Sequence, residues 1–163
     1  MEEKDIAKVK IINYRITMIN SDFDTNFKID LLKLLTLLNT NEKELFTKFN
    51  PEKYRGLIVG FYWNTDKPHQ DGKCRCTVKC NGKGVGFGNG GCKKITISIF
   101  KSGSIIITGG RLVQQIDDAY NKINSILRDN YCDIVKMSIL DYMDECKEVQ
   151  IPKKIVKIKK MIK

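Results

Sequence analysis

Four of the six cysteines lie close together, within a segment that is rich in glycine and poor in apolar residues. The stretch DGKCRCTVKCNGKGVGFGNGGCKK contains them with the spacing C-x-C-x₃-C-x₁₁-C, as Cys74, Cys76, Cys80 and Cys92. Four thiolates on a loop without its own core suit a tetrahedral Zn²⁺ ion, and glycine lets the backbone curl around the metal. We therefore expect these four residues to hold a structural zinc ion.

Two alternatives to this zinc site stay open, because the spacing differs from the paired C-x₂-C pattern. In the first, a partial set of cysteines is completed by His69, which precedes Cys74 by five positions. In the second, the thiols are free or form a redox pair. Cys132 and Cys146 lie outside the segment and are expected to be plain structural residues. The glycine run GKGVGFGNGG lacks G-x₄-G-K-[ST], so nucleotide binding is not expected.

The positive charge of the chain, +10 in total, is concentrated in two places. Residues 66–94 carry seven basic and two acidic groups, and residues 152–163 carry six lysines and no acid. Residues 1–65 and 95–151 are nearly neutral, at +1 and −2. Such clustering is typical of a protein that binds a polyanion through dedicated segments, and a merely solubilising surface is the alternative.

Other features of the sequence exclude several classes of protein. No apolar run approaches the roughly 18–20 residues that a membrane helix needs. The first residues, MEEKDIAK, show no secretion signal, so we expect an intracellular, reducing compartment. No serine, histidine and acid, and no pair of carboxylates, stand at a spacing that would indicate a catalytic site, so we expect that the protein is not an enzyme.

The first half of the chain predicts two strands around a pair of helices. Residues 8–20 are rich in β-branched and aromatic types and predict a strand. Leucines at helical spacing predict a helix over Ile29–Leu38. Residues 41–49 begin with acids and predict a second, shorter helix that Pro51 ends. Tyr54–Trp63 then predicts the next strand.

After the cysteine-rich insertion at 64–94, the pattern changes to a hairpin and a long helix. Ile95–Phe100 alternates as a strand with one buried face, and Ile105–Thr108 follows after a Ser-Gly turn. Apolar residues at helical spacing from Leu112 to Leu127 predict a long amphipathic helix. We therefore expect an α+β fold, with helices on one face of an antiparallel sheet and the other face open.

The end of the chain is less regular. A further helix is expected around Met137–Cys146, and the final PKKIVKIKKMIK is either an amphipathic basic helix or a frayed tail, of which we favour the tail. The expected division is a single domain over residues 1–135, which includes the insertion, and a C-terminal extension with a basic tail over residues 136–163.

The order of elements and several motifs resemble one repeat of the TATA-box-binding protein family, most closely its second repeat. The stretch ITISIFKSGSIIITGGRLVQQIDDAYNKINSIL (95–127) contains I-F-x-S-G-x-x-x-x-T-G before an amphipathic helix, at the family's spacing. NPEKYRGLIVGF is similar to the family's second strand with its preceding Pro-Glu, and NSDFDTNFKIDLLKL is similar to the end of the family's first strand and its first helix. The resemblance covers about residues 10–130, and the insertion resembles divergent versions in large DNA viruses. It implies that the chain acts in the nucleus or, if it is viral, in a cytoplasmic virus factory.

The resemblance implies a curved antiparallel sheet whose concave face lies in the minor groove, with aromatic wedges between base steps. Phe100 matches one wedge position and Tyr54 its partner. The alternative is that both are ordinary strand aromatics, but Phe100 shares parity with polar residues rather than with the buried isoleucines. The positions that match groove-floor contacts are Ile58, Ile106 and Thr108. Such contacts favour A·T-rich sites, because a guanine amino group obstructs a close apolar surface.

Other family positions are partly kept. Arg111 matches a basic residue that contacts phosphate, whereas Gly60 and Ser104 stand where arginine and lysine are usual. Lost cations weaken binding unless Lys101, the insertion or the basic tail replaces them. Ser98 stands for a usual leucine, which makes the face more polar. Asn20 is our preferred match for the family's groove asparagine, over the alternatives Met18 and Asn13.

One repeat supplies one wedge pair, so we expect a second half, most simply by homodimerisation through the sheet edge. Pairing with a separate chain and membership of a longer protein are the other routes. The expected function is a transcription initiation factor that binds and bends A·T-rich promoter DNA and recruits general transcription factors or RNA polymerase. The alternative is a protein-interaction module of the transcription machinery that has kept the fold and lost DNA binding.

Overall fold

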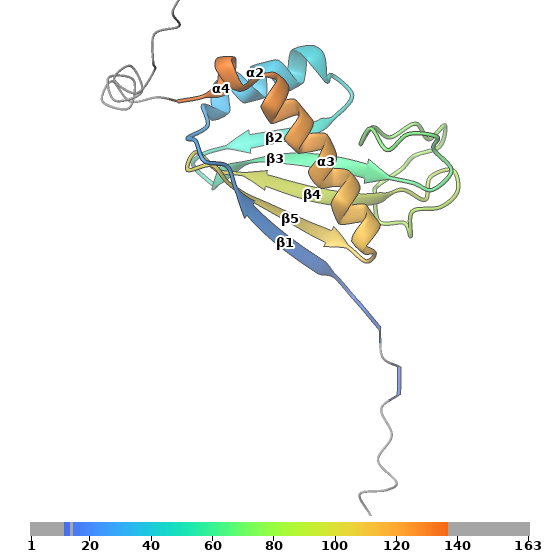
Figure 1. Cartoon of the computed structure of the whole chain (residues 1–163). Coiled ribbons are helices and arrows are strands. Elements are labelled where there is room, and N and C mark those ends of the chain that lie inside the picture. Colours follow the sequence, from blue (N-terminus) through green and yellow to red (C-terminus); the bar gives the residue numbers. More distant parts are fainter. Residues whose placement is uncertain (1–11, 14, 137–163) are drawn as a thin grey trace, which may run out of the picture.

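The computed structural model describes residues 12, 13 and 15–136, which form one five-stranded antiparallel sheet with helices on one side (Figure 1). The strands are β1 (Ile19–Asp24), β2 (Phe46–Asn50), β3 (Tyr54–Trp63), β4 (Lys93–Ile99) and β5 (Ser104–Gly110). Their order across the sheet is β1-β5-β4-β3-β2. The expected α+β class is confirmed.

Helices α2 (Leu31–Asn41) and α3 (Val113–Asp129) cover one face of the sheet, and the short α4 (Tyr131–Ile134) follows α3 (Figure 1). Their apolar residues share a single core with alternate residues of the strands. From the sheet, the core takes Leu57, Val59, Phe61, Ile95, Ile97, Ile99, Ile105 and Ile107, each at most 1% exposed. The isoleucines therefore alternate with other residues because every second side chain lies beneath the helices, as predicted.

Several predicted elements are confirmed. The strand Tyr54–Trp63 has the predicted bounds, and the hairpin and the long helix are found as β4, β5 and α3. The leucine-rich helix is found as α2, which begins at Leu31 because Asp30 caps it. The Asp30 carboxylate accepts hydrogen bonds from the amides of Leu32 and Lys33 at 3.1 and 3.2 Å.

The predicted helix over residues 41–49 is wrong. Its second half forms β2, which pairs antiparallel with β3 at the sheet edge. The acidic start and the mixed composition of this segment favour a helix locally. Pairing with β3 prevails because it gives the strand a ladder of backbone hydrogen bonds and lets Phe49 pack against the core.

The first predicted strand is also misplaced. Residues 1–11 and Tyr14 lie outside the described residues, and residues 15–18 form no strand. Instead β1 takes in the polar stretch that we expected to be a connection. Ile19 and Phe23 pack against the core, while Asn20, Asp22 and Asp24 are exposed, so only half of the strand carries an apolar signal.

The expected C-terminal helix at Met137–Cys146 and the basic tail lie outside the described residues, as does most of the expected extension over residues 136–163. Within the part of the chain that the structure describes, every helix is too short or too polar to cross a lipid bilayer.

Gly103 in the β4–β5 turn is expected to be hard to replace. Its φ is +99°, and an added Cβ would lie 2.3 Å from the Phe27 carbonyl oxygen. We expect Gly103→Ala to lower the free energy of unfolding by about 2–4 kcal/mol, since a left-handed non-glycine residue costs about 1–3 kcal/mol before any clash. Urea titration measures the loss.

Gly88→Ala is the matched control for this substitution. Gly88 also has a left-handed φ, +75°, but an added Cβ there would meet nothing within 4 Å. We expect it to lose only about 1 kcal/mol. Equal losses in the two variants would show that the turn at Gly103 has room for an added methyl group, against our expectation.

Candidate nucleic-acid interface and candidate metal centre

The sheet face that the helices leave uncovered, called the open face below, is built from the strand residues that alternate with the core. Because residues directly opposite each other in an antiparallel pair share a face, the strand register defines its rows. One row is Asp22, Ile106, Ser98, Ile58 and Lys48, and the next is Asn20, Thr108, Thr96, Gly60 and Phe46. The open face thus combines small, aliphatic and hydroxyl side chains at its centre.

Four of the sequence-predicted contact residues meet on these two rows. Ile58 and Ile106 flank Ser98, which is 9% exposed between them, and Thr108 lies opposite Asn20. Of the three candidates for the groove asparagine, Asn20 is the one that joins the sheet, whereas Asn13 and Met18 precede β1. The topology therefore brings together an amide from β1, hydroxyl groups from β4 and β5, and aliphatic groups from β3 and β5.

Tyr54 and Phe100 lie next to each other at the end of the open face. Their ring centroids are 5.8 Å apart with an interplanar angle of 63°, and Tyr54 is 42% exposed. Gly56, which shares the parity of Ile58, leaves room for both rings, because a Cβ there would lie 2.8 Å from the Tyr54 ring and 3.1 Å from the Phe100 ring. The rings therefore lie on the side away from α3, as a wedge requires, and the wedge itself stays a prediction.

Arg111 lies on the short connection between β5 and α3 and is exposed. Its backbone amide donates to the Gln115 side-chain oxygen at 2.8 Å, and the Leu112 amide donates to the same oxygen at 3.3 Å. Gln115 thereby holds the connection in one conformation. The guanidinium group stands free of the ion pairs formed among the described residues.

A basic and aromatic cluster on the open face was missed by the sequence analysis. The Lys94 ammonium lies 3.8 Å from the Phe46 ring centroid and 5.9 Å from that of Tyr62. Burial, with Lys48 as a second cause, lowers the pKa of Lys94 from its usual value. A Cβ at Gly60 would lie 2.8 Å from Lys94 Cε, so the lysine stem crosses the space that a larger residue at position 60 would need.

Two carboxylates on the open face were also missed. Asp22 and Asp24 are exposed on β1, opposite Ile106 and Ser104. Sequence analysis placed them in a connection, where an exposed acid has no particular meaning. On the sheet they give the β1 edge a negative charge. Lys48 on β2 and the ammonium of Lys94, which reaches from β4 to the Phe46 ring of β2, lie toward the opposite edge, so the open face is electrostatically polarised from edge to edge.

The four cysteines of the insertion converge on one point. The sulfur atoms of Cys74, Cys76, Cys80 and Cys92 all lie within 4.8 Å of one another. Sulfur atoms around a tetrahedral zinc ion with Zn–S bonds of about 2.3 Å lie about 3.8 Å apart, so the arrangement fits with small adjustments. His69 is exposed and is not a member of this group. The four cysteines together can hold a metal ion.

The four cysteines differ in their exposure to solvent. Cys74 is exposed and Cys92 is fully buried, with its sulfur 3.4 Å from that of Cys76. Burial raises the pKa of the Cys92 thiol to about 12. The Asn64 side chain lies beside the cluster, donating to Cys92 Sγ at 3.6 Å and to the Gly88 carbonyl at 2.8 Å. Asn64 thus supports Cys92 by a hydrogen bond from outside the set of four cysteines, as residues around metal ligands commonly do.

The insertion is attached to the helical layer by polar contacts. Lys73 pairs with Glu42 at 3.4 Å, and Glu42 also binds Lys122 of α3 at 2.5 Å. On the other side Gly86 packs against Trp63, whose indole nitrogen donates to Asp118 of α3 at 2.7 Å. The cysteine cluster is therefore held at a defined place, at the end of the sheet that carries the β3–β4 connection (Figure 1).

An antiparallel sheet with helices on one face and an aliphatic, hydroxyl-bearing open face on the other is the architecture that the motifs predicted. The family model described as transcription factor TFIID, or TATA-binding protein, matches residues 13–130. The chain therefore belongs to the TATA-binding protein family, and the resemblance stated from its motifs is confirmed. The family consists of non-enzymatic transcription factors.

A curated relative supports the same assignment. The chain is 29% identical over 154 residues, 94% of its length, to a TATA-box-binding protein-like protein of Acanthamoeba polyphaga mimivirus. This agrees with the expected likeness to the versions of large DNA viruses. The aligned part is 36% of that relative, so the chain spans about a third of the length of the viral protein.

Proposed function

We propose that the chain is a transcription initiation factor whose open face binds the minor groove of A·T-rich promoter DNA and bends it. The observation that carries this proposal is the exposed Tyr54–Phe100 pair at the end of a face lined by Ile58 and Ile106. Flat apolar rings replace base stacking at a kinked step, and the aliphatic rows cover the groove floor. The hydroxyl of Thr108 and the amide of Asn20 supply donors for the acceptors of A·T pairs.

Lys94 and Arg111 are the phosphate-binding residues in this proposal. Gly60 stands where the family usually has arginine, and the Lys94 stem lies across that position with its ammonium on the same face. A partly desolvated cation on an aromatic ring is held in place, so little side-chain entropy is lost when a phosphate binds. Lys48 lies nearby and adds to the positive potential.

A second half completes the DNA site in this proposal. β1 and β2 form the edges of the sheet, and an unpaired edge strand is a surface for pairing with another strand. We infer homodimerisation through a sheet edge, with a second repeat on another chain or in a longer protein as the other arrangements. General transcription factors or RNA polymerase are the proposed protein partners.

The cysteine cluster is, we propose, a structural zinc site. Four sulfur ligands with no open position are typical of structural rather than catalytic zinc. Cys74, Cys76, Cys80 and Cys92 would hold the ion, which would close a glycine-rich insertion that lacks an apolar core. Asn64 would orient Cys92 through its hydrogen bond.

Fluorescence anisotropy with labelled duplexes tests DNA binding by the full chain. We expect A·T-rich duplexes to bind more tightly than G·C-rich ones, and affinity to fall steeply with salt. Lys94→Gln and Arg111→Gln should each lower the slope of log K against log salt by about 0.9, the value for one phosphate contact.

Arg128→Gln is the matched control, because the Arg128 side chain is 75% exposed on the helical layer. It should leave both the affinity and the salt slope unchanged. The second candidate function is a protein-interaction module without DNA binding, and the exposed acids Asp22 and Asp24 on the open face favour it. A folded chain that shows neither an A·T preference nor a salt slope would establish this alternative.

A further inference from the structure

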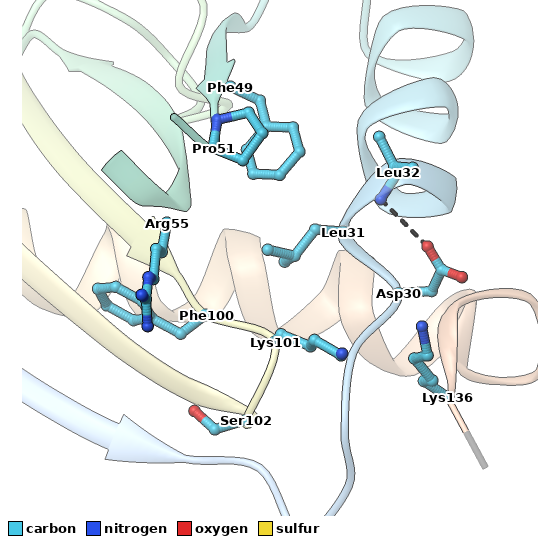
Figure 2. Close-up of a pocket in the computed structure, with 10 residues that line it drawn as sticks. All are labelled: Asp30, Leu31, Leu32, Phe49, Pro51, Arg55, Phe100, Lys101, Ser102 and Lys136. Carbon is cyan, nitrogen blue, oxygen red and sulfur yellow. Dashed lines mark hydrogen bonds between the residues drawn. The ribbon is translucent and has the colours of Figure 1, made fainter. Parts of the chain in front are cut away.

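A pocket of about 650 Å³ opens at the end of the sheet that lies away from the cysteine insertion. Five segments meet around it, namely the start of α2, the end of β2 with the following turn, the start of β3, the β4–β5 turn, and Lys136 after α4 (Figure 2). None of the residues that line it belongs to the cysteine cluster, and only Phe100 belongs to the proposed DNA-contact set. The pocket is therefore a separate feature of the surface.

One wall of this pocket is apolar. It consists of Leu31, Leu32, Phe49, Pro51 and Phe100 (Figure 2). Leu32 is 65% exposed although it lies in the first turn of α2, where a polar residue would cost nothing. Phe49 is only partly buried against the core. An exposed leucine beside a half-covered phenylalanine offers a place for a bulky apolar side chain.

The rim of the pocket is positively charged. Arg55, Lys101 and Lys136 line it and are exposed, and none of them takes part in the ion pairs among the described residues. Asp30 is the acid in the lining, and its carboxylate is engaged by the two amides at the start of α2. The rim thus presents three cations, and its one carboxylate is already hydrogen-bonded to the backbone.

The pocket is preformed, because backbone hydrogen bonds join its walls. The Ile29 amide donates to the Lys101 carbonyl at 3.0 Å, which ties the start of α2 to the β4–β5 turn. The Lys136 amide donates to the Lys28 carbonyl at 2.7 Å, and the Asp30 amide to the Ile134 carbonyl at 2.7 Å. A site with fixed walls loses little entropy when a ligand enters.

We propose that this pocket docks an acidic segment of a partner protein, with one bulky apolar side chain against the Leu31–Phe49 wall and carboxylates on the cationic rim. Charge complementarity selects the acidic segment, and the guanidinium of Arg55 suits a bidentate carboxylate. DNA fits less well, because a phosphate backbone has no apolar side chain to cover the wall. Leu31 and Phe49 lie on the core side of the sheet, whereas Phe100 belongs both to the pocket lining and to the proposed wedge, so the pocket and the DNA site meet at that ring.

Fluorescence anisotropy with a defined probe tests this proposal on the full chain. The probe is a labelled synthetic peptide in which aspartates flank one phenylalanine and one leucine. Its two control peptides have asparagine for every aspartate, or alanine for both apolar residues. We expect the probe to bind the wild-type chain and both controls to bind at least about tenfold more weakly, since charge and apolar contact both contribute.

Variants of the chain then locate the site. Arg55→Glu combined with Lys101→Glu should weaken probe binding by about tenfold or more, and Leu32→Gln by several fold. Leu32→Gln keeps good helix propensity at an exposed position, so the fold should survive, as circular dichroism can verify. Arg128→Glu reverses an exposed charge on α3 and should change nothing. No binding by the wild type, or equal binding by all variants, would refute the docking site.

Two further experiments test whether the pocket is occupied by something other than a partner protein. Residues 137–150 follow Lys136 directly and include four acids with several apolar residues. If neutralising those acids in the full chain raises probe affinity, the chain's own segment competes for the pocket, and a separate partner is not its occupant. If a G·C-rich duplex, which the open face is not expected to favour, displaces the probe, the rim binds phosphate, and the proposal is wrong. Probe binding that is unchanged in both experiments supports it.

Discussion

Replacing Phe100 by alanine is expected to abolish most of the bending of an A·T-rich duplex and to weaken its binding by about 10–100-fold. An inserted ring compensates for unstacking a base step, which costs a few kcal/mol, and each 1.4 kcal/mol corresponds to about tenfold in affinity. Phe100 lies beside Tyr54 at 5.8 Å on the side of the sheet away from α3. Bending is measured by energy transfer between dyes at the duplex ends.

Tyr54 variants sharpen this prediction, because Phe100 also lines the pocket at the sheet end. Tyr54→Ala should reduce bending as Phe100→Ala does, whereas Tyr54→Phe should keep it, since the flat ring is what replaces stacking. Tyr120→Ala is the matched control. Tyr120 is also an exposed aromatic in an edge-to-face pair, with Phe23 at 4.9 Å, but it lies on α3. Normal bending by a folded Phe100→Ala chain would rule out the wedge.

Removing zinc is expected to unfold the insertion and to lower the melting temperature of the chain by about 10 °C or more. Structural zinc contributes several kcal/mol or more to folding, and 1 kcal/mol moves Tm by about 2–4 °C in a chain of this size. The purified protein should contain one zinc ion, and cobalt substitution should give the absorption of thiolate ligands. Calorimetry with and without a chelator measures the loss of stability.

Cysteine variants identify the ligands. Cys92→Ser should lose most zinc binding, because Cys92 is the buried member of the cluster. Cys132→Ser is the matched control, since Cys132 is exposed on α4 outside the cluster. A metal-free protein with a Cys76–Cys92 disulfide would instead establish the redox alternative, for which the two sulfurs, 3.4 Å apart, lie close enough after a small shift.

The predicted fold was correct where the sequence pattern reports burial directly. The isoleucines of β4 and β5 alternate because each second one lies beneath the helices, and α2 and α3 carry apolar stripes for the same reason. The prediction for residues 41–49 was wrong, since the local composition favours a helix and only pairing with β3 makes the segment a strand. The polar β1 was missed because half of its residues face solvent.

Some residues of the candidate sites could likewise be predicted from the sequence, and others could not. The cysteines could be grouped from their spacing alone, because a glycine-rich loop without a core brings its ligands within reach of one ion. The Lys94–Phe46 contact could not, since β2 was taken for a helix and the two residues are far apart in the chain. Asp22 and Asp24 became residues of the open face only when β1 was seen to pair with β5.

The family, the alternation of the central strands, the amphipathic helices and the cysteine set could all be predicted from the amino-acid sequence. Each of these is a local pattern, repeated every two or about 3.6 residues or confined to one segment. The register of the edge strands, the charge polarity of the open face and the pocket at Arg55 and Lys101 became evident from the folded chain. These depend on contacts between distant segments, whose free energy is not encoded in any single stretch of the chain.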